Sequence, residues 1–179
     1  CLYMTEYVRK RNGSLEIVTF DKVADRIKYL CQGVLRDGTT IGPSLNINYT
    51  KVAKDVISKI VNGISTSELD NFAANFCASL AKDNYQYNIL GGRIAVSNHQ
   101  KNTLNSFTNT VRFLYDNKTS DGSSHHLIDQ STYKFIMRNS QKLEEMIDYL
   151  RDYKLDYFGF MTLLNSYLLK RHDKPINVS

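Results

Sequence analysis

The stretch from Tyr7 to Val18 reads YVRKRNGSLEIV, and it determines how the chain begins to fold. Two short runs of alternating side chains flank Asn12-Gly13, a pair that strongly favours the turn of a β-hairpin. A two-residue turn would pair Lys10 with Leu15 and would place Glu16 on the opposite face, because side chains alternate along a strand. The face that Lys10 shares is otherwise apolar, and its other members are Val8, Leu15 and Ile17.

Beyond the hairpin, apolar residues recur at helical spacing along most of the chain. Asp21 is expected to cap the first helix, and Ser65 and Glu68 have the spacing of a capping box. The fold class is therefore mainly α, a helical bundle with a small N-terminal β-hairpin, followed by a further helical segment. The helices expected are 21–35, 50–62, 66–80, one long or bent helix over 85–115 that Gly91-Gly92 interrupts, and short helices over 131–138, 141–149 and 160–170.

Composition limits the classes of protein to which the chain can belong. Its 179 residues suffice for one domain, or for a small domain with part of another. The formal charge of +5 and the pI near 9.0 suit an anionic partner, whether a nucleotide, a nucleic acid or a membrane surface. No apolar run reaches the roughly 18 residues of a membrane span, so we expect no membrane partner. Three cysteines without a CxxC pair disfavour a disulfide framework and a four-ligand zinc site.

Basic residues concentrate near the start of the chain. Arg9, Lys10 and Arg11 lie in the hairpin, and Lys22 and Arg26 share one face of the next helix. Phosphate groups bind where donors converge from several elements near a helix start. The alternative is that these side chains are solvated. Lys10 is the exception, because a cation on an apolar face needs an anionic partner or access to water.

Other polar residues also admit two interpretations. Thr66 and Asp70 lie four residues apart at a helix start, where they could bind a sugar or base, or could serve as a cap and compensate the helix dipole. Lys101 is a single helical lysine, which is usually solvated. His125-His126 project in different directions from a polar loop, so no metal site is expected. We recognise no nucleophile with its base, no carboxylate pair and no glycine-rich phosphate loop, so the sequence predicts no catalytic residues.

Three groups of residues, in order along the chain, resemble one protein family. Val8-x-Lys10-Arg11-Asn12-Gly13, followed by Phe20-Asp21-Lys22, is similar to the start of the ATP-cone, the allosteric nucleotide-binding module of ribonucleotide reductases. Leu90-Gly91-Gly92-Arg93-Ile94-Ala95-Val96-Ser97-Asn98, followed by Lys101, resembles the stretch just after the cone in class I large subunits of eukaryotic and viral type. Tyr157-Phe158-Gly159-Phe160-x-Thr162-Leu163 is similar to the helical segment before their catalytic barrel.

The resemblance implies a helical bundle lidded by a small β-sheet, with ATP or dATP bound as an allosteric effector together with Mg²⁺. Lys10, Arg11 and Lys101 would hold the phosphates, and Lys22 would frame the site. No residue of the chain itself is implied as a metal ligand.

The same resemblance assigns the sugar and the base. Glu16 would accept a hydrogen bond from the adenine amino group, and Ile27 would contact the base. Thr66 would touch the phosphate or sugar region, and Asp70 would lie by the sugar, where ATP and dATP differ. The predicted hairpin register conflicts with this arrangement, because it places Lys10 and Glu16 on opposite faces.

The resemblance further implies an ATP-cone over residues 1–103 and a helical segment over residues 104–179 that precedes the barrel. Enzymes of this family reduce ribonucleoside diphosphates to deoxyribonucleotides with a radical that a small subunit supplies. This stretch lacks the catalytic cysteines and should be inactive alone. Cones of relatives associate with one another, and Asp21 is the matched position for such contacts. The location expected is cytoplasmic.

Two alternatives remain open from the sequence. The chain could be a basic helical module that binds nucleic acid, although it contains no recognisable nucleic-acid motif. It could also be a stand-alone ATP-cone regulator, although the zinc-ribbon cysteines of such a regulator are missing.

Overall fold

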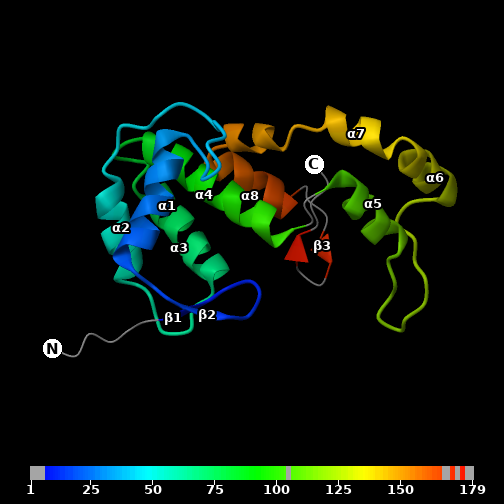
Figure 1. The fold of residues 1–179 in the computed structure, drawn as a ribbon, viewed down its shortest axis with the longest axis horizontal. Coiled ribbons are helices and arrows are strands. Elements are labelled where there is room, and N and C mark those ends of the chain that lie inside the picture. The colour runs from blue at the N-terminus through cyan, green and yellow to red at the C-terminus, as the bar shows by residue number, and fades with distance from the viewer. Residues whose placement is uncertain (1–6, 104–105, 167–169, 172–173, 176–179) are drawn as a thin grey trace. The chain divides into compact units, whose positions relative to one another are not determined.

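The computed structural model describes residues 7–103, 106–166, 170–171 and 174–175. These residues are mainly helical, and a small antiparallel sheet lies near the N-terminus, as the sequence predicts (Figure 1). The elements are β1 (Tyr7–Arg9), β2 (Leu15–Ile17), α1 (Phe20–Gln32), α2 (Tyr49–Ile57), α3 (Thr66–Ser79), α4 (Gln86–Asn102), α5 (Phe107–Tyr115), α6 (Gln130–Arg138), α7 (Ser140–Met146), the 3₁₀ helix η1 (Tyr149–Lys154), α8 (Tyr157–Ser166), β3 (Lys170–Arg171) and β4 (Lys174–Pro175).

The hairpin forms as predicted, but its register is shifted by one residue. Val8 lies opposite Glu16, and Arg9 lies opposite Leu15. The reason is a three-residue connection in which the Gly13 amide donates to the Lys10 carbonyl oxygen at 2.9 Å. Gly13 has a φ of 84°, a left-handed conformation that suits glycine in this type of hairpin loop.

The shifted register changes which side chains share a face. A one-residue slip moves every side chain of one strand to the other side. Glu16 now lies on the same face as Val8 and Lys10, so the conflict that the sequence raised disappears. Leu15 and Ile17 lie on the opposite face, where they are 61% and 47% exposed, so the apolar face predicted for them was wrong.

The hairpin is attached to the segment that precedes α3. The Arg9 amide donates to the Ile64 carbonyl oxygen at 2.8 Å, and the Gly63 amide donates to the Tyr7 carbonyl oxygen at 2.8 Å. The capping box predicted at Ser65 and Glu68 is confirmed, with both reciprocal hydrogen bonds present. These backbone bonds therefore hold the hairpin against the start of α3.

Helix α1 begins earlier than the sequence predicts. Thr19, not Asp21, is its N-cap, and the Thr19 hydroxyl accepts from the Lys22 amide at 3.4 Å. Asp21 lies in the first turn and is exposed. The predicted cap was wrong because threonine and aspartate both suit a cap, and the sequence does not choose between neighbouring candidates.

Helix α4 runs through Gly91-Gly92 without a break. A Cβ atom at Gly92 would lie 2.5 Å from the Leu155 carbonyl oxygen, so the glycine permits a close backbone approach. The helix ends at Asn102, and α5 starts at Phe107. The prediction of a single long helix over residues 85–115 was therefore wrong. The glycine pair allows close packing and does not interrupt α4.

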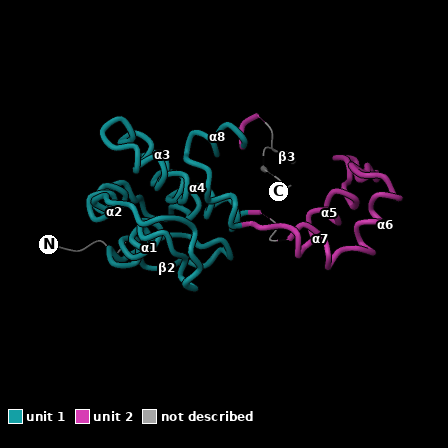
Figure 2. Tube along the Cα trace, turned by 90° about the horizontal axis from the view of Figure 1, so that it is seen from above, with its two compact units in different colours: residues 1–102, 150–163 teal, residues 103–149, 164–179 magenta. Residues whose placement is uncertain are grey.

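The chain forms two compact units, which Figure 2 shows in different colours. Unit 1 consists of residues 1–102 and 150–163, and unit 2 consists of residues 103–149 and 164–179. Residues 150–163 thus belong to the same compact unit as the hairpin and α1 to α4. The predicted division into an ATP-cone over residues 1–103 and a second segment over residues 104–179 stays a prediction.

The core of unit 1 joins the inner faces of its helices. Aliphatic side chains from α1, α2 and α4 are almost fully removed from water, which supplies the main stabilising free energy. The large aliphatic side chains of this core are Ile27, Leu30, Val52, Val56, Leu90, Ile94 and Val96.

Candidate functional site

A cavity of about 720 Å³ opens in unit 1 between the hairpin, α1, α3 and α4. This volume is within the range of roughly 300–1,000 Å³ that is typical of small-molecule sites. Residues of the loop after α1 and of η1 complete its wall. All of the lining residues belong to unit 1.

Charged side chains from several elements line the cavity. The acids are Glu16, Asp37 and Asp70, and the cations are Lys10, Lys22, Arg26, Arg36 and Lys101. Five cations against three acids leave an excess of positive charge, which favours a ligand with several negative charges.

Glu16 joins the hairpin to α1 electrostatically. Its carboxylate pairs with the ammonium groups of both Lys10 and Lys22. Hydrogen bonds from Lys10 and then Lys22 lower the pKa of Glu16 to about 2, so the side chain is ionised at neutral pH. Both lysines remain about half exposed, and they can therefore also reach a ligand at the mouth of the cavity.

Asp70 on α3 is a buried carboxylate, 6% exposed. Burial raises its pKa, and the opposing effects of Arg26, Lys101 and Arg11 do not cancel the increase. Its Oδ2 atom lies 2.8 Å from Nη2 of Arg26 and 3.6 Å from Nη2 of Arg11. Neither approach gives Oδ2 a well-aligned hydrogen bond among the described residues, so this buried oxygen keeps acceptor capacity for a ligand.

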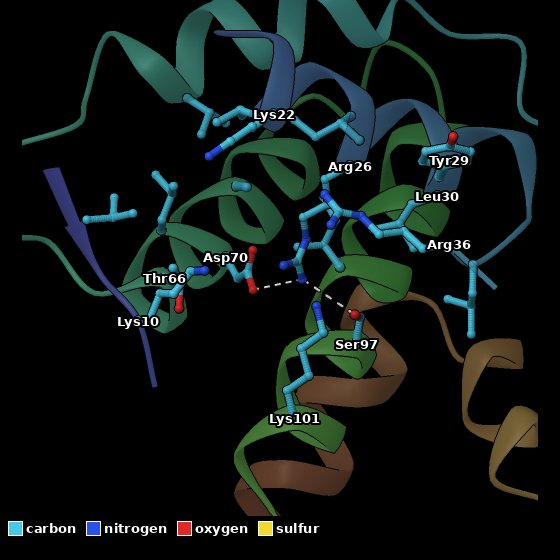
Figure 3. Close-up of a pocket in the computed structure, with 18 of the residues that line it drawn as sticks. Lys10, Lys22, Arg26, Tyr29, Leu30, Arg36, Thr66, Asp70, Ser97 and Lys101 are labelled. Carbon is cyan, nitrogen blue, oxygen red and sulfur yellow. Dashed lines mark hydrogen bonds and ion pairs between the residues drawn. The ribbon is translucent and has the colours of Figure 1, made fainter. Parts of the chain in front are cut away.

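Lys101 reaches the cavity from α4. Lys101 is an exposed residue, but Figure 3 shows its ammonium end pointing towards Arg26 and Asp70. Removal of water around that end lowers the pKa of Lys101 to about 8, and repulsion from Arg26 adds to the effect, whereas Asp70 opposes it. A ligand phosphate at this position would raise the pKa of Lys101 again and so favour its charged form.

The remainder of the wall is apolar. Ile27 is 3% exposed, and Leu30 is 4% exposed, and both lie on α1. Val8 from the hairpin, Ala73 from α3 and Ile94 from α4 add to this surface. The cavity therefore offers an apolar surface beside a cluster of cations, which suits a ligand with a flat ring system and an anionic tail.

The structure brings most of the predicted site residues to this one cavity. The predicted residues that line it are Lys10, Glu16, Lys22, Ile27, Thr66, Asp70 and Lys101. Arg11 does not line it. Its guanidinium donates to Asn98 Oδ1 at 2.6 Å, to Asn102 Oδ1 at 2.8 Å and to the Thr66 hydroxyl at 3.4 Å. Arg11 thus connects the hairpin to α3 and α4 beside the cavity.

Seven further polar residues of the wall were not assigned to the site from the sequence: Arg26, Tyr29, Arg36, Asp37, Ser97, Gln100 and Tyr153. The sequence placed Arg26 in the same basic cluster as Lys22, four residues before it on the same helical face, but gave no reason to assign it to the site. Arg36 and Tyr153 carried no such signal, since a loop and a distant segment bring them to the cavity.

The described residues offer neither a metal site nor a reactive cysteine. No group of three or more histidine, cysteine or acidic side chains among them could hold a metal ion. Burial raises the pKa values of Cys31 and Cys77 to about 12, so neither is a reactive thiolate at neutral pH. Each helix in the described part of the chain is too short or too polar to cross a lipid bilayer.

A protein-family model, the ATP cone domain, matches residues 6–102, which include the hairpin and α1 to α4. The chain belongs to this family. The match covers the whole of the cavity wall except Tyr153. The helical bundle with its small sheet therefore has the architecture of an ATP cone.

Similarity to known proteins extends beyond the cone. The large subunit of ribonucleoside-diphosphate reductase from Dictyostelium discoideum is 39% identical over 95% of this chain and 19% of its own length. The large subunit from vaccinia virus (strain Copenhagen) is 38% identical over 95% of the chain and 21% of its own length. The subunit from Arabidopsis thaliana is 39% identical over 92% of the chain and 19% of its own length. The chain thus spans about a fifth of these relatives, and it corresponds to their N-terminal part.

Proposed function

We propose that the ATP cone, residues 1–103, binds ATP or dATP in the cavity as an allosteric effector. The observation that carries this proposal is the convergence of cations from the hairpin, α1, the following loop and α4 around a partly apolar cavity. A triphosphate complements the cations, and an adenine ring complements the apolar wall.

Within this proposal, each part of the nucleotide has partners. Lys10, Lys22 and Lys101 bind the phosphates, with Arg11 supporting them from the side. Glu16 accepts from the adenine amino group, and the base contacts Ile27. The shifted hairpin register supports this arrangement, because it puts Lys10 and Glu16 on one face.

Asp70 and Thr66 are the proposed partners of the ribose. The buried Oδ2 atom of Asp70 has spare acceptor capacity, and a ribose hydroxyl is a suitable donor. dATP lacks one of these hydroxyl groups, so Asp70 is the residue at which the two nucleotides would be distinguished. Mg²⁺ would arrive on the phosphates, since Glu16 is already paired with two lysines and Asp70 is buried beside Arg26.

At the level of the whole protein, we propose that the chain is the regulatory region of a ribonucleoside-diphosphate reductase large subunit. The relatives that match 95% of the chain carry that name. Such an enzyme reduces ribonucleotides with a radical from a small subunit, acts in the cytoplasm, and associates through its cones. Exposed Asp21 on α1 is the proposed contact position for that association.

Calorimetric titration of the chain with ATP and dATP, each with Mg²⁺, tests the proposal. Lys10→Ala should weaken both nucleotides several-fold, because it removes a charge at the mouth of the cavity. Lys118→Ala in unit 2 is the matched control and should leave both affinities unchanged. A folded chain that binds neither nucleotide would rule out the proposal, and tight binding of a single-stranded oligonucleotide instead would favour the nucleic-acid alternative.

A further inference from the structure

One wall of the cavity comes from outside the matched cone. Tyr153 lies in η1, about fifty residues after the end of the family match, and its side chain is 5% exposed. It lines the same cavity as Lys101 and Asp70. A ligand in the cavity would therefore be adjacent to a segment that the cone does not include.

A continuous chain of polar contacts connects this tyrosine to the opposite wall. The Ser97 hydroxyl on α4 lies close enough to the Tyr153 phenol to lower its pKa, although burial has the larger effect and raises it. Nη2 of Arg26 donates to the Ser97 hydroxyl at 3.4 Å, and the same nitrogen lies 2.8 Å from Oδ2 of Asp70. Figure 3 shows this nitrogen between Ser97 and Asp70. Ser97 thus contacts Arg26 and lies beside the Tyr153 phenol.

The segment that carries Tyr153 is attached to α4 on both sides of it. On one side, the Gln100 amide donates to Oδ2 of Asp152 at 3.0 Å. On the other, the Asn88 amide donates to Oδ2 of Asp156 at 3.0 Å. Since α4 also carries Ser97 and Lys101, a change at the cavity can act on the segment through short, direct contacts.

We propose that Tyr153 is a positioning residue of the nucleotide site, which holds Arg26 in place through Ser97. Through Tyr153, the binding of a nucleotide would also be transmitted to residues 150–163. This inference rests on the proposed function of the cavity. A nucleotide that fills the cavity covers the Tyr153 ring and engages Arg26, which restrains the segment. The relay thereby extends the effector site beyond the ATP cone.

The test combines nucleotide titration with hydrogen exchange on the 179-residue chain. Tyr153→Phe removes only the hydroxyl group and keeps the buried ring. We expect it to weaken ATP roughly three- to tenfold, the scale of one lost hydrogen bond. ATP should slow amide exchange in residues 150–158 of the unmodified chain, and this protection should be smaller in Tyr153→Phe. Tyr157→Phe, in the same segment but outside the cavity wall, is the matched control and should change neither result.

A double-mutant cycle with Arg26→Lys separates positioning from simple packing. If Tyr153 acts through Arg26, Tyr153→Phe should have little further effect on ATP affinity in the Arg26→Lys background. A tyrosine that only packs would weaken binding equally in both backgrounds. Ser97→Ala, which breaks the relay at its middle, should reproduce the effect of Tyr153→Phe and serves in its place if that variant does not fold.

The outcomes distinguish this inference from the proposed function. If the unmodified chain binds neither ATP nor dATP, the proposed function and the relay both fail. If it binds ATP while Tyr153→Phe and Ser97→Ala bind equally well with unchanged protection of residues 150–158, only the relay is overturned. Additive effects of Tyr153→Phe and Arg26→Lys would overturn it as well.

Discussion

Units 1 and 2 differ in how far their helices are removed from water. In unit 1, every residue of α4 from Leu90 to Asn98 is buried. In the described part of unit 2, α5 contributes the buried residues Thr110, Val111 and Leu114, whereas α6 and α7 contain none. Large apolar side chains of unit 2 stay at the surface, with Phe135 63% and Met146 72% exposed.

This difference bears directly on the candidate site. Cations such as Arg26 and Lys101 are held close together only if the structure beneath them offsets their mutual repulsion and the cost of their desolvation. The buried length of α4 supplies that support in unit 1. Since neither α6 nor α7 contains a buried residue among those that the structure describes, we expect unit 1 to be the more stable and the more rigid of the two units.

The largest effect expected in this comparison comes from truncating one leucine in each unit, a buried one in unit 1 and an exposed one in unit 2. Leu90 has no exposed surface, and Leu90→Ala should destabilise unit 1 by about 2–5 kcal/mol. Leu127 of unit 2 is 49% exposed, and Leu127→Ala should cost less than about 1 kcal/mol. Urea unfolding followed by circular dichroism measures both. Equal losses would contradict the difference in burial.

A smaller effect is expected from the close approach at Gly92. The Cβ of Gly92→Ala would lie 2.5 Å from the Leu155 carbonyl oxygen and 2.6 Å from the Asp156 carbonyl carbon, so the backbone must shift. Overpacking of this kind typically costs about 1–3 kcal/mol, although the better helix propensity of alanine offsets part of it. The melting temperature should fall, and hydrogen exchange should rise around residues 155–156. An unchanged melting temperature would show that α8 does not depend on this contact.

The desolvation of Lys101 in unit 1 also predicts that nucleotide binding depends on pH. The pKa of Lys101 is lowered to about 8 in the free protein, and a bound phosphate would raise it again. ATP affinity should therefore fall roughly tenfold between about pH 7 and pH 9, as the free lysine loses its proton. Lys101→Arg keeps the charge throughout this range and should remove the dependence in calorimetric titrations.

Over this pH range, the folding stability should change in the opposite direction to the nucleotide affinity. The unfolded chain holds the Lys101 proton up to its ordinary pKa of 10.5, so between about pH 8 and 10.5 it binds more protons than the folded chain. The contribution of Lys101 to the free energy of unfolding should accordingly increase with pH in that window. The measurement is the difference in free energy of unfolding between the wild-type chain and Lys101→Arg from pH 8 to 10.5. If this difference stays constant over that range, the ammonium group of Lys101 is not desolvated.

The smallest effect expected comes from the helix caps. Ser65→Ala removes the cap of α3 and should destabilise unit 1 by about 1 kcal/mol, with a lower midpoint of urea unfolding. Asp129 caps α6 through the Ser131 and Thr132 amides, and Asp129→Ala should fray α6 locally. Hydrogen exchange should then increase in residues 130–138 without a shift of the main unfolding transition. A shift as large as that of Ser65→Ala would show that the two units unfold together.

Local signals in the sequence predicted local structure well. The capping box at Ser65 and Glu68 and the hairpin around Asn12-Gly13 depend on residues a few positions apart, and both form. The hairpin register and the cap at Thr19 were missed, because adjacent alternatives differ by little free energy in an isolated segment. Contacts of β1 with Ile64 and Gly63, more than fifty residues away, accompany the register that forms.

The sequence by itself determined the mainly helical class and the hairpin, which follow from composition and short-range patterns. Most of the charged residues of the cavity were assigned from the family resemblance, which also needs only the sequence. Only the tertiary structure decided that Lys10 and Glu16 share a face, that Arg11 turns aside to Asn98, and that Tyr153 lines the cavity. The physical reason is that burial and electrostatic pairing depend on which distant segments pack together, and a linear pattern does not encode that separation in space.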